Sequence, residues 1–171
     1  IAMMESETLS QSAPLFGRRT GQILIDPLNF SQSRQFFPEK NFSDFLNIYT
    51  ITGGMPAYLL QFVSAGELSE EIKKKIFIKT AFLYNEVEFT LKEELRETKN
   101  YLAILRAIAL GKRKLSEIVS EVGLDKATAN KYLSVLINLR LVEREVPVTE
   151  DKPDKSRRGL YKISDNFFVF W

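Results

Sequence analysis

The chain has 171 residues and 44% apolar content, enough for one ordinary hydrophobic core or two small ones. It contains no Cys and no His, which excludes disulfides, thiolate chemistry, imidazole bases and Cys/His metal sites. The formal net charge is +2, but it is unevenly spread: residues 1–96 hold 10 basic and 12 acidic side chains, whereas residues 97–171 hold 14 and 10. A polyanionic partner would therefore prefer the second part.

No apolar run approaches the roughly 20 residues that span a bilayer, and no secretory signal pattern is present. We therefore expect a cytoplasmic protein without a membrane partner. Ile1 at the start and Trp171 at the end of an apolar run predict that both ends are cuts through larger structures. The alternative is a natural start at Met3 or Met4.

The first fifty residues predict short elements. Residues 1–13 indicate a short helix or turn, and residues 17–21, GRRTG, a basic loop. Ile23 to Ile25 predict a short strand that Asp26-Pro27 stops. Two helices follow in the prediction, one from Ser31 to Phe37 and one that begins at Asn41 or Ser43.

The next segment predicts helices separated by glycines. Gly53-Gly54 breaks the helical pattern, and Pro56 suits the first turn of a helix that carries Tyr58 to Val63. Ser69 is predicted to cap one long amphipathic helix, with an apolar stripe repeating every three to four residues. The stripe consists of Ile72, Ile76, Thr80, Leu83 and Val87. A shift of composition near residues 97–100 marks the best domain boundary.

Residues 101–163 predict three helices and a hairpin. Helices are expected from Tyr101 to Leu110, from Leu115 to Val122, and after the Asp125 cap. Gly123 fits the left-handed turn between the second and third helices. LVEREVPV and GLYKI alternate like strands and flank a polar loop. This arrangement is typical of a winged helix-turn-helix.

In a DNA-binding interpretation, the third helix would lie in the major groove of duplex DNA. Its outward residues would supply base contacts from Asn130 and Lys131 and phosphate contacts from Thr128 and Ser134, with Lys126 beside them. Arg157 and Arg158 on the wing would lie against the DNA backbone or minor groove. Winged helices also serve as protein contacts, and the wing holds acidic residues as well. The sequence leaves DNA and protein partners open.

Several blocks together resemble the archaeal ATPase family, which belongs to the STAND branch of AAA+-like P-loop NTPases. The resemblance covers essentially the whole chain, with the blocks in the family's order. They are PLFGRRTGQILIDPLNF, YTITGGMPAYL, FLYNEVEFTLKEELRE, NYLAILRAIA and KSRRGLYKISDNFFVFW.

This resemblance implies an ATP- and magnesium-dependent switch whose P-loop core precedes the residues seen here. Gly54, Met55 and Pro56 match the family's GxP motif, which implies a lid contact to the base and ribose of the nucleotide. The DNFFVFW segment resembles the start of a further carboxy-terminal domain. Arg140 departs from the family, which usually has Gly there, and because a left-handed Arg is strained we expect a looser turn.

The catalytic signatures are missing from the chain itself. No GxxxxGK[ST] motif and no Walker B strand is present, so phosphoryl transfer cannot be assembled from these residues. Arg18 and Arg19 could sense a phosphate, or could anchor the loop to the rest of an ATPase core. The acidic residues between 86 and 94 are interpreted as a solvated helix face.

The sequence therefore predicts a mainly α (α+β) chain with four parts. Residues 1–50 would be the last strand and helices of an α/β P-loop ATPase core, 51–98 a helical lid, 99–163 a winged helix-turn-helix, and 164–171 the start of a further domain. The predicted function is part of an ATP-binding switch, inactive alone and possessing no metal site. The alternatives are a winged-helix DNA-binding transcription regulator and a protein-interaction module.

Overall fold

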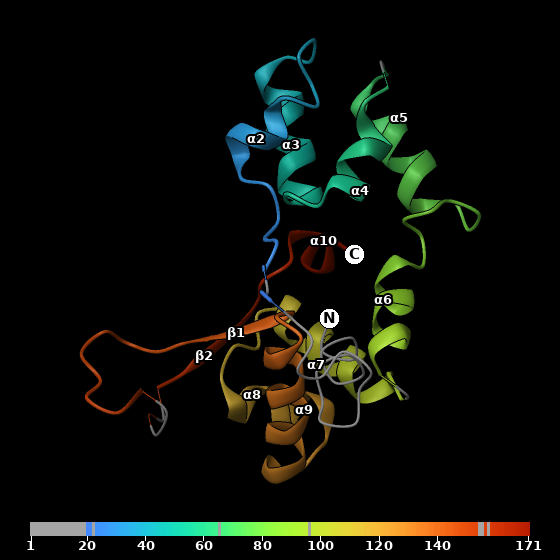
Figure 1. Ribbon diagram of the computed structural model, residues 1–171. Coiled ribbons are helices and arrows are strands. Elements are labelled where there is room, and N and C mark those ends of the chain that lie inside the picture. Colours follow the sequence, from blue (N-terminus) through green and yellow to red (C-terminus); the bar gives the residue numbers. More distant parts are fainter. Residues whose placement is uncertain (1–19, 22, 65, 96, 154–155, 157) are drawn as a thin grey trace.

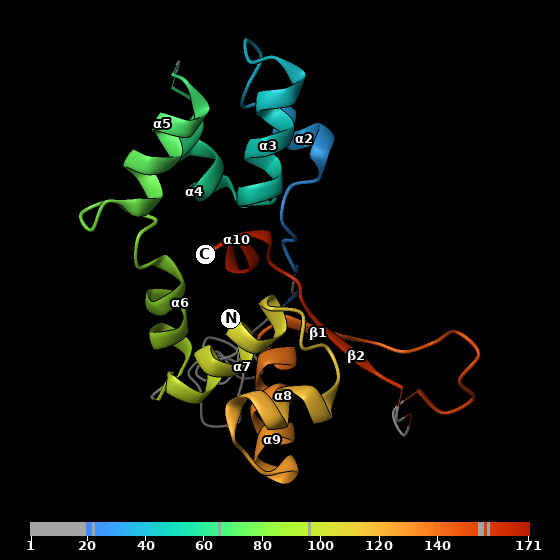
Figure 2. The same ribbon diagram turned by 180° about the vertical axis from the view of Figure 1, so that it is seen from behind.

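Figure 1 shows the computed structural model, which describes residues 20–21, 23–64, 66–95, 97–153, 156 and 158–171. Two groups of helices lie one above the other, with α6 linking them along one side and α10 between them (Figures 1 and 2). The upper group and the link contain α2 (Phe30–Arg34), α3 (Phe42–Thr52), α4 (Pro56–Leu59), the 3₁₀ turn Leu60–Phe62, α5 (Leu68–Ile72), the π-helical turn Lys73–Phe77 and α6 (Glu86–Glu94). The lower group contains α7 (Lys99–Ala109), α8 (Leu115–Val122), α9 (Lys126–Asn138), β1 (Val142–Glu145) and β2 (Leu160–Ile163), followed by α10 (Asn166–Phe170).

Capping residues and a glycine determine where the first helices begin and end. Asn29 rather than Ser31 caps α2, because its side chain accepts from the Gln32 N–H while the Gln32 side chain accepts from the Asn29 N–H. α2 ends at Arg34, before the predicted limit. Asn41 caps α3 as expected, and Gly53, at φ 59°, ends it. Pro56 occupies the first turn of α4, where its missing N–H costs no helix bond.

The predicted strand at Ile23 to Ile25 is not formed. Ile23 and Ile25 are almost fully exposed, and neither they nor Leu24 belong to a sheet among the described residues. A strand requires a neighbour that accepts and donates its backbone hydrogen bonds. The β-type sequence pattern is present here, but the described part of the chain supplies no such neighbour.

The prediction of one long helix from Ser69 was wrong. Glu67 caps α5, the π-helical turn ends at Phe77, and turns follow until α6 begins at Glu86. The break leaves the Tyr84 carbonyl free to accept a hydrogen bond from the Trp171 indole at 2.8 Å. In a continuous helix that carbonyl would accept from the residue four positions later. Thr80, predicted in the buried stripe, is exposed as a result.

The lower group follows the predicted pattern closely. α7, α8 and α9 form with the expected boundaries to within two residues, Gly123 adopts φ 73°, and the Asp125 side chain caps α9. β1 and β2 pair antiparallel, with Val142 opposite Ile163 and Arg144 opposite Tyr161. Val142, Tyr161 and Ile163 are buried, so one face of the hairpin covers the helices. The loop between the strands projects away from the body (Figure 1).

Arg140 adopts the left-handed conformation at φ 59°, so the expectation of a looser turn was wrong. The Leu141 N–H donates to the Leu136 carbonyl at 3.0 Å, and the Arg140 N–H to the Ile137 carbonyl at 2.9 Å. These bonds make the tight closure that usually takes Gly after a helix. The hairpin must leave α9 at this turn, and its packing holds the Arg backbone in place.

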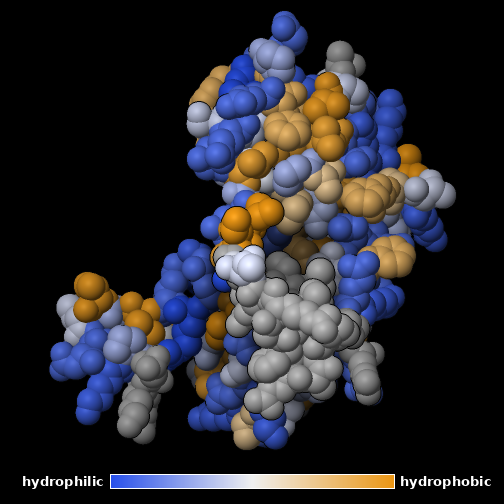
Figure 3. Space-filling view, in the orientation of Figure 1, coloured by the Kyte–Doolittle hydropathy of each residue, from blue (hydrophilic) through white to orange (hydrophobic). Residues whose placement is uncertain are grey.

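One apolar cluster runs through both groups and α10. Its fully buried members include Phe45, Leu59, Ile118 and Phe167. The Phe167 ring lies 4.8 Å from the Tyr58 ring, and α10 also packs on α3. Apolar side chains remain on the surface too, as the orange areas over the upper helices and the projecting hairpin loop show in Figure 3.

Candidate functional site: a hollow at the Gly53-Gly54 turn and the exposed face of α9

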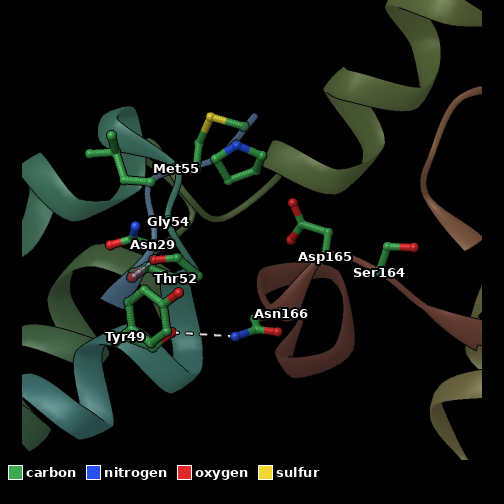
Figure 4. Close-up of a pocket in the computed structure, with 11 residues that line it drawn as sticks. Asn29, Tyr49, Thr52, Gly54, Met55, Ser164, Asp165 and Asn166 are labelled. Carbon is green, nitrogen blue, oxygen red and sulfur yellow. Dashed lines mark hydrogen bonds between the residues drawn. The ribbon is translucent and has the colours of Figure 1, made fainter. Parts of the chain in front are cut away.

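A hollow of about 220 Å³ lies beside the turn that joins α3 to α4. Three segments distant in sequence form its walls, and Figure 4 shows the side chains that they contribute. The lining residues are Pro27, Leu28, Asn29, Tyr49, Thr52, Gly53, Gly54, Met55, Ser164, Asp165 and Asn166.

Gly54 is required by the close approach of another segment. A Cβ at this position would lie 1.7 Å from the Leu28 carbonyl oxygen, so no larger residue fits without moving the backbone. The two segments are joined by a hydrogen bond of 2.9 Å from the Leu28 N–H to the Gly54 carbonyl. The Gly-Gly turn is thus fixed to residues 27–29 on one side of the hollow.

α10 forms the opposite wall. The Asn166 side chain donates to the Tyr49 carbonyl at 3.4 Å, drawn as a dashed line in Figure 4, and lies against Gly53. The Ser164 N–H donates to the Leu141 carbonyl at 2.9 Å. The end of β2 therefore connects the α9–β1 turn directly to the Gly53-Gly54 turn.

Asp165 supplies the carboxylate among those lining residues. Its Oδ1 accepts from the N–H groups of Phe167 and Phe168, at 2.8 and 3.1 Å. Burial raises the pKa of this carboxyl group above its ordinary range, although the two N–H groups oppose that shift. No described basic side chain forms an ion pair with Asp165.

Tyr58 lies close to Asp165 and also to a second carboxylate, that of Glu86. The Tyr58 hydroxyl donates to Glu86 Oε1 at 3.2 Å, and desolvation together with the charges of Glu86 and Asp165 raises the Tyr58 pKa. Glu86 is therefore a partner of the core, contrary to the interpretation of residues 86–94 as a wholly solvated face. Glu88 conforms to that interpretation, because it pairs with Lys92 at 3.2 Å on the surface.

The structure brings together only part of the predicted nucleotide motif. Gly54 and Met55 line the hollow, whereas Pro56 starts α4 and does not line it. Arg18, Arg19 and Arg157 lie outside the described residues. Asp165 was not predicted to line a functional site. The signal was an acidic residue next to a buried aromatic run, which predicts partial desolvation.

The second candidate surface is α9. Lys126, Asn130, Lys131 and Ser134 are exposed as predicted, and Thr128 is half-buried. Neither lysine forms an ion pair with another described residue, so both charges are available to a polyanion.

The hairpin presents its positive charge differently. Arg158 lies 3.5 Å from Glu150, Arg113 pairs with Glu145, and Lys162 pairs with both Glu143 and Glu145 at 2.9 Å. Arg144 donates to the carbonyls of Pro153 and Ser156. Arg158 and Lys162 of the hairpin are thus paired with acidic side chains, and Arg144 is held by backbone carbonyls.

In the described part of the chain, no helix has the length and apolar character to cross a membrane, and no three acidic side chains gather as a metal site would require.

Comparison with known proteins gives three findings. The chain is 38% identical over 173 residues to an uncharacterized protein of Methanocaldococcus jannaschii, covering all of this chain and 38% of that archaeal protein. Its fold is similar to part of a Walker-type ATPase of Pyrococcus abyssi, with a TM-score of 0.63 and 20% identity over 98% of this chain and 47% of the ATPase. The chain thus spans less than half the length of either protein. Residues 43–164 match the family described as Domain of unknown function (DUF8612), and the chain belongs to that family.

Proposed function

We propose that this chain is the lid and winged-helix part of a P-loop ATPase of the STAND branch of AAA+-like NTPases. In the intact ATPase the Gly54-Met55 turn would contact the base and ribose of ATP. The observation that carries the proposal is the hollow formed by this turn with residues 27–29 and 164–166. The fold likeness to part of a Walker-type ATPase and the GxP resemblance support it.

The residues of the hollow fit part of a nucleotide but not all of it. Sites for drug-sized ligands usually measure about 300–1,000 Å³, so a hollow of about 220 Å³ accommodates a group the size of a base or a sugar. Met55 offers an exposed apolar side chain for contact with a flat ring. The phosphates and Mg²⁺ would be held by a P-loop core that this chain does not contain, together with Arg18 or Arg19 if these sense phosphate.

The proposed switch uses the contacts that join the two helix groups. Residues 51–98 would act as the lid, and residues 99–163, with α7–α9 and the hairpin, as the winged helix. Because Asn166 lies against Gly53 and Ser164 is bonded to Leu141, movement at the turn is transmitted to the α9–β1 corner.

The test uses a polypeptide that joins this chain to a P-loop domain. Met55→Ala should weaken ATP binding several-fold, as measured by titration calorimetry, because it removes a wall of the hollow. Leu60→Ala is the matched control, since Leu60 is an exposed apolar residue on the same segment that does not line the hollow. Equal ATP affinities for the two variants would remove the hollow from the nucleotide site.

A second function, binding of duplex DNA, is favoured by the unpaired lysines of α9. Lys126 and Lys131 would meet phosphates and Asn130 a base edge, with Thr128, Ser134, Arg157 and Arg158 in supporting contacts. The ion pairs of Arg158 and Lys162 limit the electrostatic contribution of the wing. A winged helix that fails to bind DNA at low salt would instead be a protein-interaction surface.

A further inference from the structure

We propose that the Asp165 carboxylate selects the nucleoside end of the ligand by accepting a hydrogen bond from it. The donor would be an exocyclic amine of the base or a hydroxyl of the ribose. This inference rests on the proposed function, because it assigns a specificity-determining contact within the same hollow.

The first support is an unused acceptor. Both backbone N–H groups that Asp165 caps bind to one oxygen, Oδ1. Oδ2 accepts no hydrogen bond from any described residue. In the described part of the chain, every fully buried side-chain oxygen or nitrogen has a hydrogen-bond partner. Because Oδ2 has none, it is not fully buried and can be approached by a ligand. The side chain lines the hollow, and Figure 4 shows its carboxylate on the side facing Met55.

The second support is the sign of the charge. Asp165 has no described cationic partner, and Glu86 adds a second negative charge nearby through Tyr58. A phosphate placed against this pair would be repelled by about 1 kcal/mol at 4 Å in water, and by more where water is excluded. The neutral, donor-bearing end of a nucleotide is therefore the part that fits beside Asp165, with the phosphates directed away.

The third support is the cost of a missing donor. A half-buried carboxylate loses hydration when a ligand fills the hollow, and only a donor on the ligand replaces the lost hydrogen bond. A site of this kind rejects analogues that lack the donor more strongly than it rejects analogues of altered apolar shape.

Asp165 also caps α10, and the test has to separate the two roles. Asp165→Asn keeps an oxygen for the Phe167 and Phe168 N–H groups but places an NH₂ group where Oδ2 stood. Glu86→Gln is the matched control, because it removes one negative charge from the same region without altering the lining of the hollow. The indole N–H resonance of Trp171, which reports its bond to Tyr84, checks that α10 stays docked.

The experiment titrates this chain with adenosine and follows the amide resonances of Gly53 and Gly54 by NMR. We expect Asp165→Asn to weaken adenosine binding about tenfold or more, as for loss of a hydrogen bond to a charged group, and Glu86→Gln to change it less than about twofold. With the unaltered chain, inosine should bind more weakly than adenosine if the amine is the donor. 2′-Deoxyadenosine or 3′-deoxyadenosine should do so if the ribose is.

Four results would overturn the inference. If adenosine shifts the two glycine resonances equally well in Asp165→Asn, the contact is absent while the nucleotide site stands. If Glu86→Gln weakens binding as much as Asp165→Asn, a general charge effect replaces the contact. If adenosine leaves Gly53 and Gly54 unshifted at millimolar concentration, the proposed nucleotide site and this inference fail together. Should Asp165→Asn undock α10, the analogue series decides: equal affinities for all four nucleosides exclude a selected donor.

Discussion

Asp125 and Asp165 both cap the start of a helix, but in two different surroundings. Each begins a helix and accepts from two backbone N–H groups, in α9 and α10 respectively. Hydrogen bonds from Thr128 hold the pKa of the exposed Asp125 carboxyl below its usual value, whereas burial raises the pKa of Asp165. The same cap is therefore a purely structural device on the surface of α9 and an energetically costly charge beside the hollow.

The difference separates the two candidate surfaces by charge. The α9 face presents unpaired lysines and suits a polyanion, while the hollow presents an unpaired carboxylate and suits a hydrogen-bond donor. If both are used in one protein, the hollow and α9 would bind chemically distinct ligands. The link from Ser164 to Leu141 would let one site affect the other.

The largest effect is expected from disrupting the close contact between Gly54 and Leu28 at the wall of the hollow. Gly54→Ala places a Cβ 1.7 Å from the Leu28 carbonyl oxygen, which is backbone and cannot swing aside. We expect a loss of about 3 kcal/mol or more in the free energy of unfolding, at or above the upper range for overpacking. Urea denaturation measures it. Gly21→Ala is the control, because no atom lies within 4 Å of its added Cβ, and similar stabilities for both variants would contradict the close approach.

The next largest effect is expected on DNA binding by the exposed face of α9, the helix that Asp125 caps. Lys126→Ala combined with Lys131→Ala should weaken binding to duplex DNA by about tenfold at low salt and reduce the salt slope by roughly two. Fluorescence anisotropy at several salt concentrations measures both. Lys92→Ala is the control, since Lys92 pairs with Glu88 on α6. If all three proteins bind alike, or none binds at low salt, α9 is not a DNA-binding surface.

The elements around these two aspartates were unequally predictable from sequence. α8, α9 and the hairpin depend on local signals, including the Gly123 turn and the Asp125 cap, which operate over a few residues. The break before α6 has no such signal, and the bond that uses it joins the Trp171 indole to the Tyr84 carbonyl across 87 positions in sequence. The hollow likewise needs residues 27–29, 49–55 and 164–166 to meet, which only tertiary packing decides. The motif glycine Gly54 was recognisable, whereas its contact with Leu28 was not.

A smaller effect is expected at the turn that connects α9 to the hollow. Arg140→Gly should stabilise the chain by about 0.5–1 kcal/mol, because the left-handed backbone strains a residue with a Cβ, although Gly adds entropy to the unfolded chain. Thermal unfolding measures the change. Arg140→Ala keeps the strain and loses the 3.7 Å contact with Asp26, so it should not stabilise the protein. A gain in both variants would show that the side chain, and not the backbone, is unfavourable.

The smallest effect is a pair of opposite pH dependences, measured as the unfolding free energy of the wild type minus that of each Asn variant. Asn at either position keeps an acceptor for the cap, so the difference isolates the titrating charge.

At Asp165 the folded-state pKa is raised, so the folded chain binds the proton more tightly than the unfolded chain does. The stabilising contribution is complete below the unfolded pKa of about 3.9 and is lost as pH rises through the higher folded value. At Asp125 the folded-state pKa is lowered, so its contribution is present above the unfolded value and is lost as pH falls through the folded one. The Asp165 difference should therefore decrease with rising pH, and the Asp125 difference should increase. Urea titrations from pH 3 to pH 7 decide the matter, and two differences that both increase with pH would show that burial does not raise the pKa of Asp165.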